Sequence, residues 1–367
     1  MTNTQRILDT LRGLPVDRPP VNFYEIGGFN VDPADPSPYN VYNSPDWQPL
    51  LQLAEEKTDI MRFGIIRAVP RYPELHRELV TSESRDTGRS IITVTTYRVG
   101  GRTLTRTDRR DREADTVWHT EHLLKNTDDL RTFLSIPDEF FLWDYDASPM
   151  KKQEEALGSR GVVMADGADA LAEAAVLFSM EDYTVLALTE EALFRSLLDK
   201  LQPSQLDRYT QIAAQRPDTV WRLCGPEYAT PPYLPPALFR EYVVPYDKPL
   251  IDIIHGSGGL CRLHCHGKIK RVAPCIAELG PDGIDPVEPP DQGDVTLTEA
   301  RELLGPGVAL FGNIEASDIE TLRPRDFAEK VRTAVAEGTA GPGGFALQPS
   351  ASPYGRRIAP SVIENYI

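Results

Sequence analysis

Short apolar runs separated by longer amphipathic stretches dominate the second half of the chain. The stretches between the runs, such as 190–201 and 237–254, carry apolar residues at helical spacing. Buried strands that alternate with helices predict a parallel sheet covered by helices. The six runs with strand length are "GVVMAD" (161–166), "TVWRLC" (219–224), "GLCRLH" (259–264), "DGIDPV" (282–287), "GVALFG" (307–312) and "GGFALQ" (343–348).

Two further strands would close such a sheet into an eight-stranded barrel. One is "VNFYE" (21–25), and the other lies between residues 58 and 140, where the pattern does not fix its place. An open doubly wound sheet is disfavoured because no G-x-G-x-x-G or P-loop follows the first strand. We therefore predict that residues 1–367 form one α/β domain, a single (β/α)8 barrel of the TIM type.

Residues 89–120 break this pattern with β-branched alternation. The run "SIITVTTYRVGGRTLTRT" is typical of a hairpin that turns at Gly100-Gly101. We expect an inserted antiparallel β-meander that covers part of the barrel or supports a homodimer.

Composition narrows the class of partner. The formal net charge of −16 argues against nucleic acid and anionic membranes, because phosphate surfaces attract basic proteins. Three of the four cysteines lie within 261–275, a distribution that suits a reducing compartment better than a disulfide framework. The segment "MTNTQRILDTLRG" has no apolar signal region, and no stretch approaches the ~20 apolar residues of a membrane helix. We expect a cytoplasmic protein that acts on a small molecule.

Polar side chains recur where the predicted strands end, and barrel enzymes place their chemistry at the carboxyl ends of strands. Some of these residues could equally be caps that begin the following helices. In chain order, the polar residues at or just after strand ends are Glu25, Asp166, Glu227, His264, His266, Glu288, Asn313 and Gln348.

The run from 260 to 266 is the most informative. Because side chains alternate along a strand, Arg262, His264 and His266 share the face that looks into the barrel. Cys265 points the other way and is expected to pack beneath helices. Two histidines at i and i+2 can bind one metal ion, with Glu227 as the first candidate for a third ligand and Glu288 or Asp294 next. The alternative is a polar pocket without metal.

Several segments together resemble the uroporphyrinogen decarboxylase superfamily, which includes zinc-dependent methyltransferases linked to corrinoid proteins. In order they are "QRILDTLRGLPVDRPPV", "LPPALFREYVVPYDKPLIDIIHGSGG", "LHCHGKI", "LGPDGIDPVEPP", "VALFGNI" and "GGFALQPSASP". The resemblance implies a (β/α)8 barrel with its active site at the carboxyl ends of the strands.

The chain departs from both main branches of that superfamily. True porphyrinogen decarboxylases carry an arginine-containing motif after the first strand, whereas this chain has "FYEIGGFNVDPADP". The methyltransferases hold zinc with a His-x-Cys-Gly motif and a later cysteine. Here His266 stands at the place of the first cysteine, and Ser350 or Ala351 at the place of the second. A set of His264, His266 and Glu227 would be a harder site, suited to zinc and also to iron or manganese.

Three functions remain open. The first is a metal-assisted methyl or group transferase that takes its methyl group from a corrinoid on a separate protein. Glu288 or Asp294 would then act in acid–base chemistry and Asn313 would bind substrate or cofactor. The second is a carboxy-lyase for a small carboxylate-bearing substrate, and the third is a ligand-binding barrel without catalysis. Substrate contacts are expected from Glu25, Asp166, Arg262 and Gln348.

Overall fold

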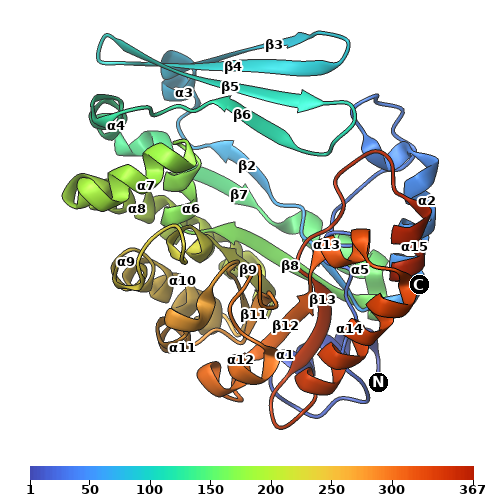
Figure 1. Cartoon of the computed structure of the whole chain (residues 1–367). Helices are drawn as coiled ribbons and strands as arrows, with labels where there is room; N and C mark the ends of the chain where they lie inside the picture. The colour runs from blue at the N-terminus through green and yellow to red at the C-terminus, as the bar shows by residue number, and fades with distance from the viewer.

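A computed structural model describes residues 1–367 as a curled parallel sheet wrapped by helices (Figure 1). The sheet has seven strands in the order β1-β8-β9-β10-β11-β12-β13, and every neighbouring pair is parallel. These strands are β1 (Ile60–Phe63), β8 (Gly161–Ala168), β9 (Val220–Cys224), β10 (Leu260–His264), β11 (Gly283–Val287), β12 (Ala309–Ile314) and β13 (Phe345–Pro349). All six predicted apolar runs are strands, and β1 is the strand that the pattern could not place.

Helices follow most of these strands and cover the outer face of the sheet (Figure 1). The bounds are α1 (Asn3–Leu11), α2 (Gln48–Lys57), α3 (Pro73–Leu79), α4 (Thr127–Leu134), α5 (Ser148–Leu157), α6 (Ala170–Ala175), α7 (Met180–Thr189), α8 (Glu191–Gln215), α9 (Pro236–Tyr242), α10 (Val244–Gly256), α11 (Ala273–Leu279), α12 (Leu297–Leu304), α13 (Ala316–Thr321), α14 (Pro324–Gly338) and α15 (Pro360–Tyr366). No helix is both long enough and apolar enough to cross a membrane.

The predicted strand at 21–25 is wrong, and the complete eight-stranded barrel is therefore not formed. Only a single bridge, between Val21 and Leu347, pairs this segment with β13. The chain then turns, because the Asn22 side chain accepts the backbone N–H of Tyr24 and Tyr24 adopts a φ of 58°. The segment still links the two edges of the sheet: the N–H of Asn22 donates to Leu347, and the N–H of Asp59, just before β1, donates to Val21.

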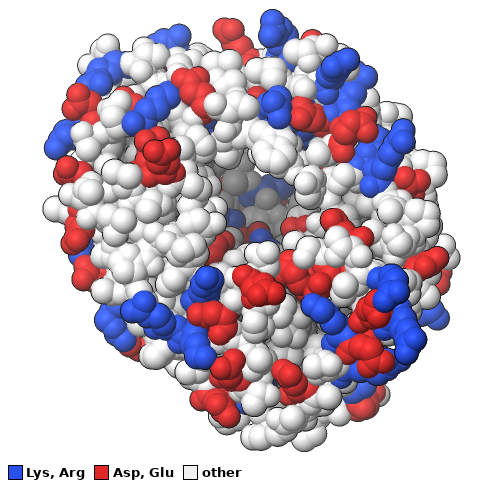
Figure 2. All heavy atoms as spheres, in the orientation of Figure 1, with Lys and Arg blue, Asp and Glu red and all other residues white.

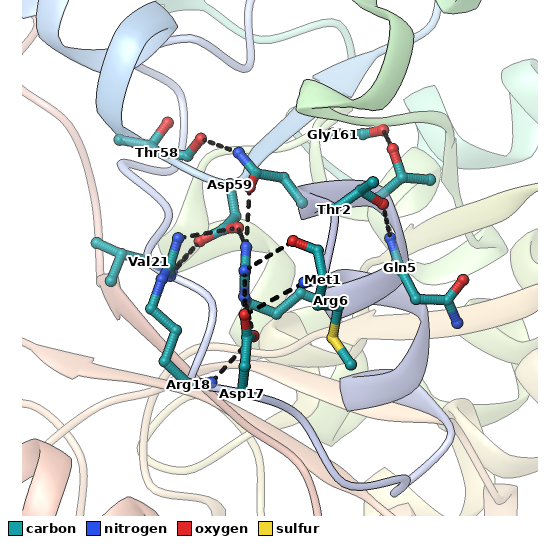
Figure 3. A network of polar contacts seen from close by, with 12 residues as sticks. Met1, Thr2, Gln5, Arg6, Asp17, Arg18, Val21, Thr58, Asp59 and Gly161 are labelled. Atoms are coloured by element: carbon teal, nitrogen blue, oxygen red, sulfur yellow. Dashed lines mark hydrogen bonds and ion pairs between the residues drawn. The ribbon is translucent and has the colours of Figure 1, made fainter.

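Asp59 is fully buried and holds residues 21–25, which we call the closing segment, in place (Figure 3). Its carboxylate accepts from Arg6 at 2.6 Å, from Arg18 at 2.7 Å and from the backbone N–H of Val21 at 2.8 Å. Asp17 contributes a second carboxylate to Arg6 at 2.7 Å. Ion pairs among α1, the loop after it and the start of β1 thus fasten the two edges of the sheet together.

The insertion is a four-stranded antiparallel sheet in the order β3-β4-β5-β6, seen at the top of Figure 1. Its strands are β3 (Val80–Asp86), β4 (Ser90–Val99), β5 (Arg102–Asp111) and β6 (Val117–Glu121). The hairpin at Gly100-Gly101 is confirmed, but the sheet starts at Val80, earlier than predicted. A two-stranded stem of β2 (Arg67–Pro70) and β7 (Trp143–Asp146) connects it to the main sheet.

Side chains of the main sheet divide into an inner and an outer core. A small apolar cluster fills the inside of the sheet near its amino end, where Ile7 and Leu11 of α1 meet Met61, Val220 and Phe311. Outward-facing residues join the large cluster beneath the helices. Cys261, Leu263 and Cys265 belong to that outer cluster, which confirms the predicted alternation along β10. The inward positions near the carboxyl ends of the strands are left to polar residues.

Candidate functional site

A hollow lies near the middle of the face shown in Figure 2, with acidic and basic side chains on its walls. Inside the curled sheet, polar side chains from β8, β9, β10, β11 and β13 meet at the carboxyl ends of these strands. We refer to this space as the inner pocket. Its side chains form two connected groups, one around Asp285 and one around Arg222.

Asp285 of β11 is the buried anion at the centre of the inner pocket. Its carboxylate lies 3.1 Å from Nε of Arg262 and 3.3 Å from Nδ1 of His264, and it accepts from the Gln348 amide at 3.3 Å. Burial alone would raise the pKa of Asp285, but Arg262 and His264 outweigh burial and hold that pKa well below its usual range. Asp285 is therefore a permanent carboxylate that orients His264.

Tyr24 joins His264 to the second group. The Tyr24 hydroxyl lies 3.5 Å from Nε2 of His264 and accepts from Nη1 of Arg222 at 2.8 Å. Nε of Arg222 donates to Asp166 at 2.7 Å, and its guanidinium lies 4.7 Å from the centre of the Phe63 ring. Burial raises the pKa of Tyr24 far above its ordinary value, so its phenol keeps its proton. The positive φ of Tyr24 is a strained conformation of the kind that occurs at functional sites.

His266 forms a second histidine–carboxylate pair beside the first. Nδ1 of His266 lies 2.8 Å from Glu288, whose other oxygen accepts the N–H of Gly267 at 2.6 Å. Burial tends to lower the pKa of His266, but Glu288 outweighs it and the pKa is raised. The rings of His264 and His266 are nearly perpendicular, with centres 4.7 Å apart. The His266 side chain is 35% exposed against 8% for His264, so a ligand entering the pocket reaches His266 first.

Glu25 supplies an acid with a pKa near neutrality. Burial raises its pKa to about 7, against the opposing effects of Arg222 and His266. Asp115 adds to the rise from the connection between β5 and β6. That connection is bound to the C-terminal segment, where the N–H of Asp115 donates to Tyr354 at 2.7 Å. The inserted sheet thus contributes a carboxylate to the electrostatics of the inner pocket.

Histidine and carboxylate side chains that could bind a metal ion are present, but they do not all point to one position. In metal sites, a ligating histidine commonly gives its other ring nitrogen to a carboxylate. His264 and His266 both have this arrangement, which leaves Nε2 as the nitrogen for a ligand. Glu227 instead accepts the N–H of Gly225 at 2.9 Å. Nowhere in the chain do three His, Cys, Asp or Glu side chains converge as a ligand set.

Three predicted site residues lie apart from the histidines or beneath them. Asp294 accepts the backbone N–H of Lys270 at 2.9 Å. Asn313 lines a separate surface pocket with Asp318 and Lys330. Arg262, predicted to contact substrate, is only 1% exposed and is paired with Asp285. In these positions neither Asp294 nor Asn313 has a hydrogen bond to the histidine pair, and Arg262 supports the pocket from below.

Sequence reasoning missed Tyr24, Arg222 and Asp285 as members of the site. A signal existed for two of them, because "TVWRLC" and "GIDPV" each place one charged residue inside an otherwise apolar strand. A charge at such a position has to find a buried partner. Tyr24 gave no comparable signal, since its place depends on the turn after Asn22.

Comparison with known proteins agrees with this architecture. The profile of the family described as uroporphyrinogen decarboxylase (URO-D) matches residues 172–354, about half of the chain. The solved structure of a methyltransferase from Methanosarcina mazei superimposes with a TM-score of 0.60 at 15% identity, covering 100% of this chain and 97% of the other. No curated protein sequence matches. The fold and site define an α/β protein whose polar groups gather at the carboxyl ends of a curled parallel sheet. Within that class, the chain belongs to the uroporphyrinogen decarboxylase superfamily.

Proposed function

We propose that this chain is an enzyme that transfers a methyl or similarly small group to a nucleophile bound in the inner pocket. The observation that carries the proposal is the pair of histidines on one strand, each with a carboxylate at Nδ1. Such a carboxylate fixes the ring, sets its tautomer and stabilises the imidazolium that forms when Nε2 takes a proton. A thiol or hydroxyl acceptor has to give its proton to such a base, because its conjugate base is the stronger nucleophile.

His266 is the group that we assign to the proton transfer. The acceptor gives its proton to Nε2 of His266, and the electron pair of its sulfur or oxygen forms the bond to the methyl carbon. The bond between methyl and donor breaks with its electrons staying on the donor. Glu288, whose pKa is lowered despite its burial because His266 is its partner, remains an anion throughout and stabilises the charged ring. His264, held by Asp285 and Tyr24, forms the adjoining wall.

A metal ion and a corrinoid partner remain parts of the proposal. Zinc, iron or manganese would be held by His264 and His266, with Glu227 as third ligand only after leaving Gly225. Such an ion would lower the pKa of a bound thiol or hydroxyl in place of the proton transfer to His266, because Nε2 of His266 cannot bind an ion and a proton at once. Elemental analysis of untagged protein tests this beside His264→Ala and His266→Ala. About one equivalent of metal, lost in both variants, would assign Nε2 of both histidines to the ion, which then replaces His266 in activating the acceptor. No metal after incubation with all three ions would remove the ion and leave the proton transfer standing.

Methyl transfer can be tested with free methylcobalamin as donor and a panel of small thiols and phenols as acceptors, with methylated product detected by mass spectrometry. We expect product with the wild-type chain and a rate that rises with pH as His266 loses its proton, with a midpoint above the ordinary histidine value. His266→Gln should lower the rate by about 10²–10⁴-fold, the usual contribution of a general base.

The matched control is His255→Gln. His255 also pairs with a carboxylate, that of Asp282 at 2.8 Å, but on the outer surface in the last turn of α10. This variant should keep the wild-type rate. Absence of product with every acceptor, or a His266→Gln variant as fast as the wild type, would contradict the proposal.

A carboxy-lyase is the second candidate, and Arg222 is the observation that favours it. Two of its nitrogens are engaged with Asp166 and Tyr24, but its Nη2 has no hydrogen bond within the protein and could bind a substrate carboxylate. Glu25, with a pKa of about 7, could protonate the carbanion that remains when CO2 leaves. Release of labelled CO2 from small carboxylic acids, lost in Arg222→Gln, would favour this reaction over methyl transfer.

A further inference from the structure

A second cavity lies where the inserted sheet meets helices α6 and α8, and it shares no lining residue with the inner pocket. Its volume of about 310 Å³ is at the lower end of the range of about 300–1,000 Å³ that is usual for small-molecule sites. Val80 and Tyr97 of the inserted sheet form one side, and residues of α6 and α8 form the other. The cavity therefore joins the insertion to the rest of the molecule.

Aromatic rings form much of the wall. The residues that carry them are His76, Tyr97, Phe140, Phe141, Trp143 and Tyr145. These rings hold one another in place, because His76 stacks on Phe140 with ring centres 4.1 Å apart and meets Trp143 edge-on at 5.0 Å. Nε2 of His76 also donates to the backbone carbonyl of Phe140 at 2.7 Å. A wall of fixed rings suits a flat apolar group and, at the ring faces, a cation.

Two groups of opposite charge line the same cavity without pairing with each other. The carboxylate of half-buried Glu173 on α6 has no hydrogen bond or ion pair in the protein, and its oxygens keep surface that a ligand can reach. Burial raises the pKa of Glu173, and Arg208 is the charge that opposes this rise. Arg208 on α8 donates through Nη2 to the backbone carbonyl of Asp166 at 2.8 Å, while its Nη1 has no partner and stays accessible.

A ligand of this cavity has to suit both charges. A simple anion would lie near the Glu173 carboxylate and a simple cation near the Arg208 guanidinium, and such repulsion is stronger in a half-buried space than in water. A zwitterion avoids both conflicts, because its ammonium group can pair with Glu173 and its carboxylate with Arg208. Helices α6 and α8 are in contact, so the two charges of the ligand have to be close together. The rest of the ligand has to fill a space walled by rings.

We propose that this cavity is a second binding site, for a free α-amino acid with an aromatic side chain. The site does not depend on the proposed group transfer. It is nevertheless connected to the inner pocket, since Arg208 donates to the backbone of Asp166, whose carboxylate accepts from Arg222.

The probes are phenylalanine, tyrosine and tryptophan, and their binding to the full chain is measured by calorimetry. Phenylalanine is then compared with phenethylamine, which lacks the carboxylate, and with hydrocinnamate, which lacks the ammonium group. Each analogue should bind at least about tenfold more weakly, because one charged group of the cavity keeps no partner. Absence of binding by all three amino acids at millimolar concentration, or an analogue that binds as tightly as phenylalanine, would overturn the proposal.

Two substitutions assign the charges. Glu173→Gln should weaken phenylalanine and phenethylamine about tenfold without weakening hydrocinnamate, and Arg208→Gln should weaken phenylalanine and hydrocinnamate without weakening phenethylamine. The matched control, Glu191→Gln, removes an exposed carboxylate at the start of α8 and should leave every affinity unchanged. If the first two variants melted like the wild type but changed both analogues alike, Glu173 and Arg208 would not be the partners of the ligand, which overturns the proposal.

Three further variants locate the bound amino acid. Ser204→Phe, on α8 at the cavity, should abolish binding, whereas Ser196→Phe makes the same change at an exposed position of the same helix and should not. Arg222→Gln should leave binding intact, although it removes the group that could hold a carboxylate in the inner pocket. Binding that survives Ser204→Phe in a variant that melts like the wild type, or that is lost in folded Arg222→Gln, would place the amino acid elsewhere and overturn the proposal.

Discussion

Arg262 and Asp285 are a fully buried ion pair on neighbouring strands, and each depends on the other. Removing one partner leaves an uncompensated charge, which costs roughly 3–5 kcal/mol in the free energy of unfolding. We therefore expect Arg262→Met to lose about that amount at pH 7 in urea unfolding. The loss should shrink below about pH 4, because Asp285 is held ionised in the folded state and its contribution disappears as it takes a proton.

Arg240→Met is the matched control for that measurement. Arg240 pairs with Glu278 on the surface, where the two side chains are 53% and 48% exposed. Exposed pairs contribute about 0–1 kcal/mol, so this variant should unfold almost like the wild type. If the two variants lost the same stability, a group other than Arg262 would compensate the negative charge of Asp285.

Two buried aspartates join helices α6 and α10 behind the inner pocket. Asp169 caps α6 through the N–H of Ala172 at 2.6 Å, and its carboxyl group lies beside that of Asp247 on α10, close enough for each to shift the pKa of the other. Burial raises the pKa of Asp169 to about 7 and that of Asp247 well above its usual value. The folded chain thus holds protons in a pH range where the unfolded chain, with aspartate pKa values of about 4, has released them.

A raised pKa in the folded state stabilises the protein at low pH and ceases to do so as pH increases. We expect the free energy of unfolding to fall between about pH 5 and pH 7 in the wild-type chain. Asp247→Asn keeps the volume and donates an amide hydrogen to Asp169, so its slope should be shallower and its stability at pH 8 higher. Asp252→Asn, an exposed change on the same helix, should keep the wild-type slope. Parallel slopes for all three proteins would contradict the raised pKa values of these two aspartates.

Local pattern was enough to predict most of the elements and one wall of the site. Period-two alternation placed His264 on the inner face of β10 and Cys265 on the outer face, and both are confirmed. The local pattern could not predict the register between neighbouring strands. Asp166 meets Arg222 because β8 and β9 pair at exactly these residues, and that pairing is decided by packing across the whole sheet. Asn313 was assigned to the site from its strand end alone, without knowledge of which pocket it lines.

The closing segment could not be predicted for a related reason. "VNFYE" reads as a strand, yet its conformation is set by groups far away in the sequence: Leu347 on one side and Asp59, with Arg6 and Arg18, on the other. These contacts determine where Tyr24 lies. The position of Tyr24 in the inner pocket therefore depends on the closure of the sheet.

A substitution that loosens the closing segment should consequently also disturb the geometry of the inner pocket. In Asp59→Asn, one acceptor oxygen is replaced by an amide group that faces the donors of Arg18 and Val21. We expect a loss of at least about 3 kcal/mol in the free energy of unfolding, since charged donors stay buried without their anion. Hydrogen exchange should become faster in residues 18–24 before the rest of the sheet opens. Because Tyr24 would then leave His264, the proposed methyl transfer should be slower even under conditions where the variant is folded.

Asp17→Asn provides the comparison, since Asp17 binds the same Arg6 but is 46% exposed and does not contact the closing segment. Its cost should stay near 1 kcal/mol, with exchange in residues 21–24 as slow as in the wild type. Arg18 is left out of this comparison because its N–H donates to Asp17. If Asp59→Asn were less stable overall but showed no selective exchange in that segment, Asp59 would anchor only α1. The position of Tyr24 would then have to be fixed by the turn after Asn22 alone, and the link between sheet closure and the inner pocket would be lost.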